Sequence, residues 1–294
     1  MELLNAQTLS RLQGVKLRAR AVVEGVLSGL HKSPHQGQSV EFSEHKEYAP
    51  GDELRHIDWK AFGKFDRYYV KRFEHETNLR TLMAIDASAS MGYRSGPLSK
   101  LEVAKTLAGA LSYLLIRQQD AVGLAVFQEN HVRDIPPRSS AGHLNVVLSE
   151  LEQLTPRGPT DLTTAAYTLS EKAPPRSLLL VFSDLFDEHP EALKRLLQLR
   201  ARKHDVAVFH LVDPAELAFP FDDPTLFLSM EDERNIEVNP REIKQSYLEE
   251  FNAFLEQSKK TCAEADVDYE CVRTDEALDA VLLRFLSKRQ GGRK

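Results

Sequence analysis

Short apolar runs alternate with longer stretches of helical spacing along most of the chain. The runs at 82–85, 121–127, 177–183 and 206–212 predict buried strands, and a further short strand is expected at 267–272. Between these runs, apolar residues recur every three or four positions, which predicts helices. The expected helices cover about 5–30 (one helix or a pair), 98–118, 141–154, 161–172, 189–202, 241–264 and 277–287. Because parallel strands need crossovers long enough to hold a helix, the alternation predicts an α/β fold with a doubly wound, mostly parallel sheet and helices on both faces.

Two segments depart from this alternation. His131 to Ile135, closed by Pro136-Pro137, predicts a short edge strand that pairs antiparallel with its predecessor. Between about 214 and 240, two short apolar runs flank a polar turn, which predicts a small hairpin inserted at the rim of the domain.

Polar residues follow two of the predicted strands at the point where each ends. Asp86 ends the first strand, with Ser88 and Ser90 at the next alternate positions, and Asp184 ends the run at 177–183. The carboxyl ends of parallel strands meet at one edge of a sheet, where ligands bind. A carboxylate followed by two hydroxyls suits a hard cation such as Mg²⁺. Helix capping by Asp86 and local turns at the serines explain the same pattern without a ligand.

A fifth residue, Thr160, stands where a loop meets a predicted helix. With it, the set resembles the metal-ion-dependent adhesion site of von Willebrand factor A domains. The resemblance implies a von Willebrand factor A-like fold with Mg²⁺ or Mn²⁺ bound at Asp86, Ser88, Ser90, Thr160 and Asp184. It also implies that Asp184 and Thr160 often act through water, and that an open coordination position takes a Glu or Asp of another protein.

The stretch before the first long strand is dense in charged and aromatic residues. Its most distinctive residues are Glu44, Tyr48, Pro50-Gly51-Asp52, Arg55, Ile57-Asp58-Trp59, Tyr69-Val70-Lys71, Phe73-Glu74 and Glu76. Arg55 and Asp58 are spaced to pair on one helical face, and Trp59 is expected to be buried, so this stretch is interpreted as a docking element. A catalytic pocket or an interface formed by these charges is the alternative. We expect an N-terminal segment over 1–78 and a von Willebrand factor A-like domain over 79–294.

These residues resemble the signature of the bacterial family named domain of unknown function 58. Relatives are often encoded beside MoxR-type AAA ATPases, so the resemblance implies an adaptor between such an ATPase and its client. Many members carry two transmembrane helices ahead of the signature, and none is predicted in this chain.

Composition narrows the classes of function. The 294 residues carry a net charge of -6, which gives no reason to expect nucleic acid or an anionic membrane as a partner. No apolar stretch approaches the roughly eighteen residues of a membrane span. Two cysteines, Cys262 and Cys271, form neither a disulfide framework nor a metal-ligand pattern, which favours a reducing compartment. We expect a cytoplasmic protein.

The sequence offers little for catalysis. A dehalogenase-like phosphatase would need a second carboxylate at position 88, where Ser88 stands, and neither a phosphate-binding Gly-rich loop nor a nucleophile elbow is present. We therefore expect a binding module rather than an enzyme, with a Mg²⁺-dependent phosphoester hydrolase as the alternative. The sequence names neither the client nor the oligomeric state.

Overall fold

The structure is a computed structural model that describes residues 5–30, 45–47, 69–71, 79–128, 131–159, 161–187, 189 and 191–291. The chain divides into two compact units, residues 1–30 with 79–294 and residues 31–78. The segment expected over 1–78 is thus shared between the units, because its two helices pack into the first. In the second unit, strand β1 (His45–Glu47) pairs antiparallel with β2 (Tyr69–Lys71). The signature residues Arg55, Asp58 and Trp59 lie outside the described residues.

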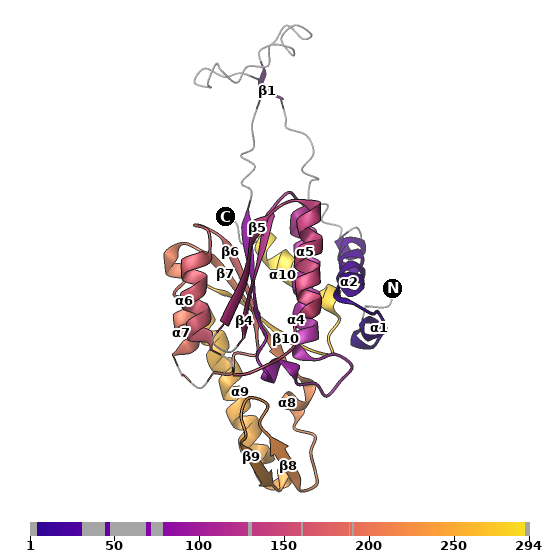
Figure 1. Cartoon of the computed structure of the whole chain (residues 1–294), viewed down its shortest axis with the longest axis vertical. Coiled ribbons are helices and arrows are strands. Elements are labelled where there is room, and N and C mark those ends of the chain that lie inside the picture. Colours follow the sequence, from indigo (N-terminus) through magenta and orange to yellow (C-terminus); the bar gives the residue numbers. More distant parts are fainter. Residues whose placement is uncertain are drawn as a thin grey trace. The chain divides into compact units, whose positions relative to one another are not determined.

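Within the described residues, a six-stranded sheet forms the centre of the first unit (Figure 1). Its strand order is β10-β7-β6-β3-β4-β5. Neighbouring strands are parallel except β5, which pairs antiparallel with β4 at the edge. The strands are β3 (Arg80–Asp86), β4 (Ala121–Gln128), β5 (His131–Arg138), β6 (Leu178–Ser183), β7 (Asp205–Val212) and β10 (Asp268–Arg273). The predicted fold class is therefore confirmed.

Strand β5 is longer than the sequence predicted, because it continues through Pro136 and Pro137 to Arg138. An edge strand tolerates proline, since one side of its backbone needs no hydrogen-bond partner. The register of β4 against β5 shifts between Val122 and Leu124. Gly123 lies at that shift, and a Cβ there would lie 2.6 Å from the carbonyl oxygen of Ile135, so this close approach requires glycine.

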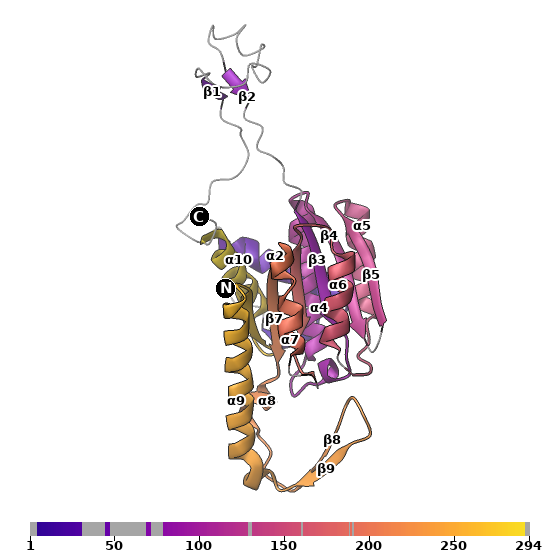
Figure 2. The same cartoon turned by 90° about the vertical axis from the view of Figure 1, so that its left-hand side faces the viewer.

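Helices cover both faces of the sheet (Figures 1 and 2). Helices α1, α2, α4, α5 and α10 contribute to one hydrophobic core, and α6, α7 and α9 to the other. Their bounds are α1 (Ala6–Ser10), α2 (Val15–Leu30), α4 (Lys100–Arg117), α5 (Ala141–Gln153), α6 (Leu162–Lys172), α7 (Ala192–Leu197), α9 (Pro240–Glu264) and α10 (Leu278–Gly291). Among the described residues, no helix combines the length and apolar character needed to cross a membrane.

The carboxyl ends of β3 and β6 lie together at one edge of the sheet. Ile85 is opposite Phe182, so the chain leaves both strands at the same level, through Asp86 and Ser183. After β3 the chain forms a short 3₁₀ turn (Ser90–Gly92) and then enters α4. Ser99 caps α4 in a reciprocal capping box with Glu102, which fixes where this helix begins.

The predicted insertion is present as helix α8 (Pro214–Ala218) and the rim hairpin, β8 (Thr225–Leu228) with β9 (Asn235–Val238). Aromatic rings hold its base: Phe219 stacks on Phe227 at 5.8 Å between centroids and lies 4.5 Å from the Tyr247 ring of α9. In Figure 2 the rim hairpin turns back from the end of α9 toward the carboxyl edge of the sheet. Its turn is therefore on the same side of the sheet as Asp86.

Candidate metal centre

Strand β3 delivers Asp86 to the edge of the sheet, where its carboxylate is fully buried. Oδ1 accepts a hydrogen bond of 2.9 Å from the backbone N–H of Ser88. Oδ2 accepts one of 2.6 Å from the hydroxyl of Ser183. The hydroxyl oxygens of Ser88 and Ser90 are 3.1 Å apart, so the structure brings the three motif residues together, and their role as metal ligands stays a prediction.

The second carboxylate, Asp184, directly follows β6 and is also fully buried. Thr160 lies outside the described residues, so its role as a ligand stays a prediction. The described loop just before it is tied to the motif. The N–H of Ala89 donates to the carbonyl of Gly158 at 2.8 Å, and the N–H of Arg157 donates to the carbonyl of Ala87 at 2.9 Å.

Burial and charge act together on Asp86. Removal from water, followed by the nearby charge of Asp184, raises the pKa of the Asp86 carboxyl from 3.8 to about 7, although the hydrogen bonds from Ser183 and Ser88 oppose the shift. Two carboxylates at one site disfavour ionisation of both unless a cation balances them. This part of the site is therefore electrostatically suited to a cation.

The structure adds a residue that the sequence analysis missed, Lys100 in the first turn of α4. Its side chain is 1% exposed, and its Nζ lies 2.8 Å from Oδ2 of Asp184 and 2.7 Å from Oε1 of Glu216. The rings of Tyr93 and Phe186 flank Nζ, with centroids at 5.9 and 5.5 Å. Burial alone would lower the pKa of the Lys100 ammonium, but the charges and hydrogen bonds of the two carboxylates outweigh it and raise that pKa.

Asp213, which follows β7, was also missed. Its carboxylate accepts hydrogen bonds from the N–H of Ser95 and of Ala215, both at 2.9 Å, and from the Thr274 hydroxyl at 3.1 Å. It caps α8 in a reciprocal capping box with Glu216, whose Oε2 accepts from the Asp213 N–H at 2.7 Å. Asp213 thereby orients the carboxylate that binds Lys100.

Two local signals could have pointed to these residues. Asp213 ends a third apolar run, and its spacing to Glu216 is that of a capping box. Lys100 occupies the first turn of a helix, where the helix dipole disfavours a positive charge. A lysine that is buried in that position requires anionic partners, and the sequence alone does not say which.

The donor atoms present fit a hard divalent cation. Among the residues the structure describes, no cluster of three or more His, Cys, Asp or Glu side chains could hold a metal ion. An ion would instead depend on one carboxylate, Asp86, with the hydroxyls of Ser88 and Ser90, an oxygen-only set that suits Mg²⁺ or Mn²⁺. When all are ionised, Asp86, Asp184 and Glu216 carry three negative charges and Lys100 carries one positive charge. These four groups leave two negative charges, which a divalent cation would balance.

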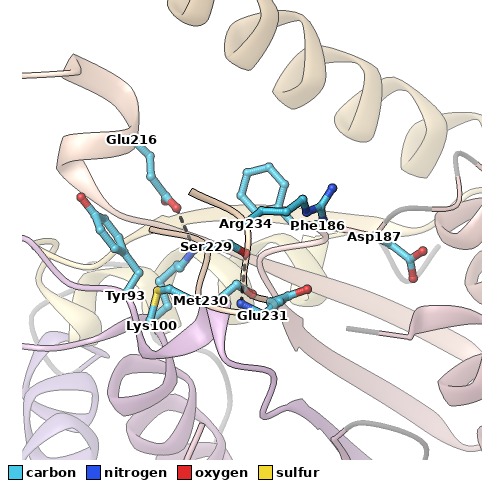
Figure 3. A pocket seen from close by; sticks show the side chains of 10 residues that line it. Tyr93, Lys100, Phe186, Asp187, Glu216, Ser229, Met230, Glu231 and Arg234 are labelled. Carbon is cyan, nitrogen blue, oxygen red and sulfur yellow. Dashed lines mark hydrogen bonds and ion pairs between the residues drawn. The ribbon is translucent and has the colours of Figure 1, made fainter. Parts of the chain in front are cut away.

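A cavity of ≈ 390 Å³ opens beside these residues (Figure 3). Its lining comes from the loops at the carboxyl edge of the sheet, from the first turns of α4 and α8, and from the turn of the rim hairpin. The lining residues are Ser90, Tyr93, Lys100, Phe186, Asp187, Glu216, Ser229, Met230, Glu231 and Arg234. The rim hairpin also touches the 3₁₀ turn, since a Cβ on Gly92 would lie 3.4 Å from the Met230 methyl. The insertion expected at the rim therefore forms one wall of the candidate site.

The family model described as "Protein of unknown function DUF58" matches residues 44–260. An uncharacterized protein of Mycobacterium tuberculosis (strain H37Rv) is 23% identical over 287 residues, covering 96% of this chain and 89% of that protein.

Among solved structures, the conserved hypothetical protein BatB from Bacteroides thetaiotaomicron has a TM-score of 0.48 at 16% identity, covering 73% of this chain and 100% of that one. The VWA domain of SpRpn10 has a TM-score of 0.41 at 11% identity, covering 69% of this chain and 93% of that one. The family assignment rests on the family model, which spans more than half of the sequence. The chain belongs to the family of proteins of unknown function DUF58.

Proposed function

We propose that the chain is a metal-dependent protein-interaction module. The observation that carries the proposal is the fully buried Asp86 carboxylate, whose pKa is raised to about 7 beside the equally buried Asp184. A Mg²⁺ or Mn²⁺ ion bound by Asp86, Ser88 and Ser90 relieves this repulsion. Thr160 and Asp184 complete the site, with Asp184 acting through water.

Such an ion retains the capacity to bind another anion. Serine hydroxyls are neutral ligands, so Asp86 offsets only part of the ion's charge, and coordination positions remain for water or for a further ligand. A carboxylate of a partner's Glu or Asp is a hard oxygen ligand of matching charge. The proposed mechanism is a metal-bridged contact between this chain and an acidic residue of the partner.

The surroundings of the site favour a protein as that partner. Leu226 and Leu228, which share one face of the rim hairpin, and Met230 in its turn are 56%, 67% and 46% exposed, and Phe186 in the cavity wall is 38% exposed. Grouped apolar side chains at a surface mark sites of protein contact. A partner segment that brings an acidic residue to the ion can bury these side chains at the same time.

We further propose that the partner is a MoxR-type AAA ATPase or its client, so that the chain serves as an adaptor between them. The test is a pull-down from the native host with the full chain as bait, in Mg²⁺ and in EDTA, beside Asp86→Ala. A partner retained only by the wild type in Mg²⁺ supports the proposal. Retention of the same partner by Asp86→Ala in EDTA contradicts it, as does Mg²⁺-dependent turnover of a phosphoester panel that Asp86→Ala abolishes.

A further inference from the structure

We infer that the Lys100 ammonium is a permanent cation within the candidate metal site. Lys100 forms an ion pair with Asp184 and thereby leaves Asp86 as the carboxylate that binds the divalent ion. The inference rests on the proposed function, because it concerns how that same ion is held. It assigns to Lys100 a positioning role: this residue sets the charge of the site without touching the partner.

The geometry of Lys100 is that of a fixed charge and not of a mobile surface lysine. Its ammonium forms two ion pairs, at 2.8 Å to Asp184 and 2.7 Å to Glu216, within a side chain that is 1% exposed. Figure 3 shows the ammonium and the Glu216 carboxylate pointing toward one another in the cavity wall. Burying an ammonium is costly unless partners of good geometry compensate it, and here two carboxylates do so.

Asp184 and Asp86 therefore differ in what they can offer to an ion. Oδ2 of Asp184 is taken by Lys100, and Oδ1 accepts a hydrogen bond of 3.3 Å from the N–H of Phe186. Among the described residues, no ion pair reaches Asp86, whose oxygens accept from Ser88 and Ser183 only. A divalent ion gains more from Asp86, which has no ion pair, because the charge of Asp184 is already partly offset by a buried ammonium.

The ion pair between Lys100 and Asp184 affects how much of the divalent ion's positive charge is neutralised by the protein. Lys100 offsets one of the two negative charges of Asp184 and Glu216. Among the proposed direct ligands of the ion only Asp86 is charged, because the hydroxyls are neutral. The ion is therefore less neutralised by its own ligands than it would be if both Asp86 and Asp184 bound it, which favours a partner's carboxylate from the cavity side. Lys100 thus weakens the affinity for the metal itself and strengthens the attraction for an anion from outside.

The test compares Lys100→Met with Lys105→Met. Lys105 lies on the same helix and is 7% exposed, but its ammonium is bound to backbone carbonyl oxygens, at 2.5 Å to Leu154 and 3.4 Å to Glu152. Affinity for Mn²⁺ and Mg²⁺ is measured by calorimetry, and the melting temperature is measured in EDTA and in Mg²⁺. The affinity of Lys100→Met for the ion should be at least about tenfold higher than that of the wild type, because the substitution removes a repelling charge and frees the Asp184 carboxylate. It should also melt lower in EDTA and gain more from Mg²⁺ than the wild type.

Lys105→Met should lose stability without any change in metal affinity. If Lys100→Met does not fold, the double variant Lys100→Met/Glu216→Gln removes an ammonium and a carboxylate together. Its net charge equals that of the wild type, so it should show a smaller increase in affinity, which comes from the freed Asp184 alone. A variant that lacks Lys100 and binds the ion no more tightly than the wild type overturns the inference while leaving the proposed function intact. If neither Mn²⁺ nor Mg²⁺ binds to the wild type or to any variant, the assignment of a metal site is contradicted, and this inference is contradicted with it.

Discussion

Ser183 and Asp86 are joined by a hydrogen bond of 2.6 Å from the serine hydroxyl to Oδ2, which ties the end of β6 to the end of β3. The N–H of Leu185 donates to the same hydroxyl oxygen at 2.9 Å, so the Ser183 proton is free to point at Asp86. Together with the N–H of Ser88, this bond sets the orientation of the Asp86 carboxylate. Groups that orient a ligand in this way tune the affinity of a metal site.

Ser183→Ala should weaken metal binding while the fold is retained. The substitution removes a hydrogen bond that lowers the pKa of Asp86, so less of this carboxyl is ionised near neutral pH. The loss of a buried hydrogen bond costs about 1 to 3 kcal/mol in stability. Denaturant unfolding and calorimetry with Mg²⁺ check both effects. Ser177→Ala is the control, since this buried serine donates to the Pro174 carbonyl at 2.6 Å before β6 begins. Equal metal affinities in the two variants would contradict the prediction.

The stability of the protein in EDTA should depend on pH through Asp86. Its pKa is 3.8 in the unfolded chain and about 7 in the folded protein, owing to burial and to Asp184. The folded state therefore holds a proton that the unfolded chain releases between these values. This contribution to stability is fully present at low pH and is lost as the pH rises toward 7. Melting temperatures across this range, in EDTA, should show the loss in the wild type and not in Asp86→Asn.

A divalent ion should reverse that trend, because it binds the ionised carboxylate. The rise in melting temperature caused by Mg²⁺ should be small at about pH 5 and should grow as the pH passes through the folded-state pKa. Asp86→Asn should respond to Mg²⁺ at neither pH. A Mg²⁺ effect of the same size at low and at neutral pH would remove Asp86 from the site.

The carboxylate contact with a partner can be tested from both sides. Asp86→Ala and Ser88→Ala should each fold and each lose binding to the same partner, and EDTA should reproduce the loss. On the partner, changing one acidic residue to its amide keeps the shape but removes the charge, so binding should weaken by about 2 to 5 kcal/mol. Titration calorimetry measures the difference. An amide variant that binds in Mg²⁺ as well as the acid does would show that no carboxylate bridges to the ion.

The apolar surface of the rim hairpin should contribute to partner binding and not to stability. Leu228→Ser removes a side chain that is 67% exposed, so the melting temperature should change little while affinity for the partner falls. Leu17→Ser is the matched control, because Leu17 of α2 is 53% exposed and is not among the residues that line the cavity. If both variants bind the partner like the wild type, the rim hairpin is not part of the interface.

Much of the fold could be predicted from local pattern. Buried parallel strands appear as apolar runs and their crossovers as helical periods, because burial of a strand or of one helix face imposes a spacing on neighbouring residues. The same reasoning places Asp86 and Asp184 at one edge, since parallel strands end on the same side of a sheet. The sequence pattern predicts that β5 ends at its prolines, whereas the edge position lets the strand continue through them.

The sequence by itself thus determined the α/β class, the order of its elements and the motif Asp86, Ser88 and Ser90. Only the tertiary structure decided what surrounds that motif. Lys100 is 84 residues from Asp184 and 116 from Glu216, and the turn of the rim hairpin reaches the site from a separate insertion. Local periodicity specifies which residues become buried. Which buried charges meet depends on strand order and helix packing, because ion pairs form between elements that only folding makes neighbours.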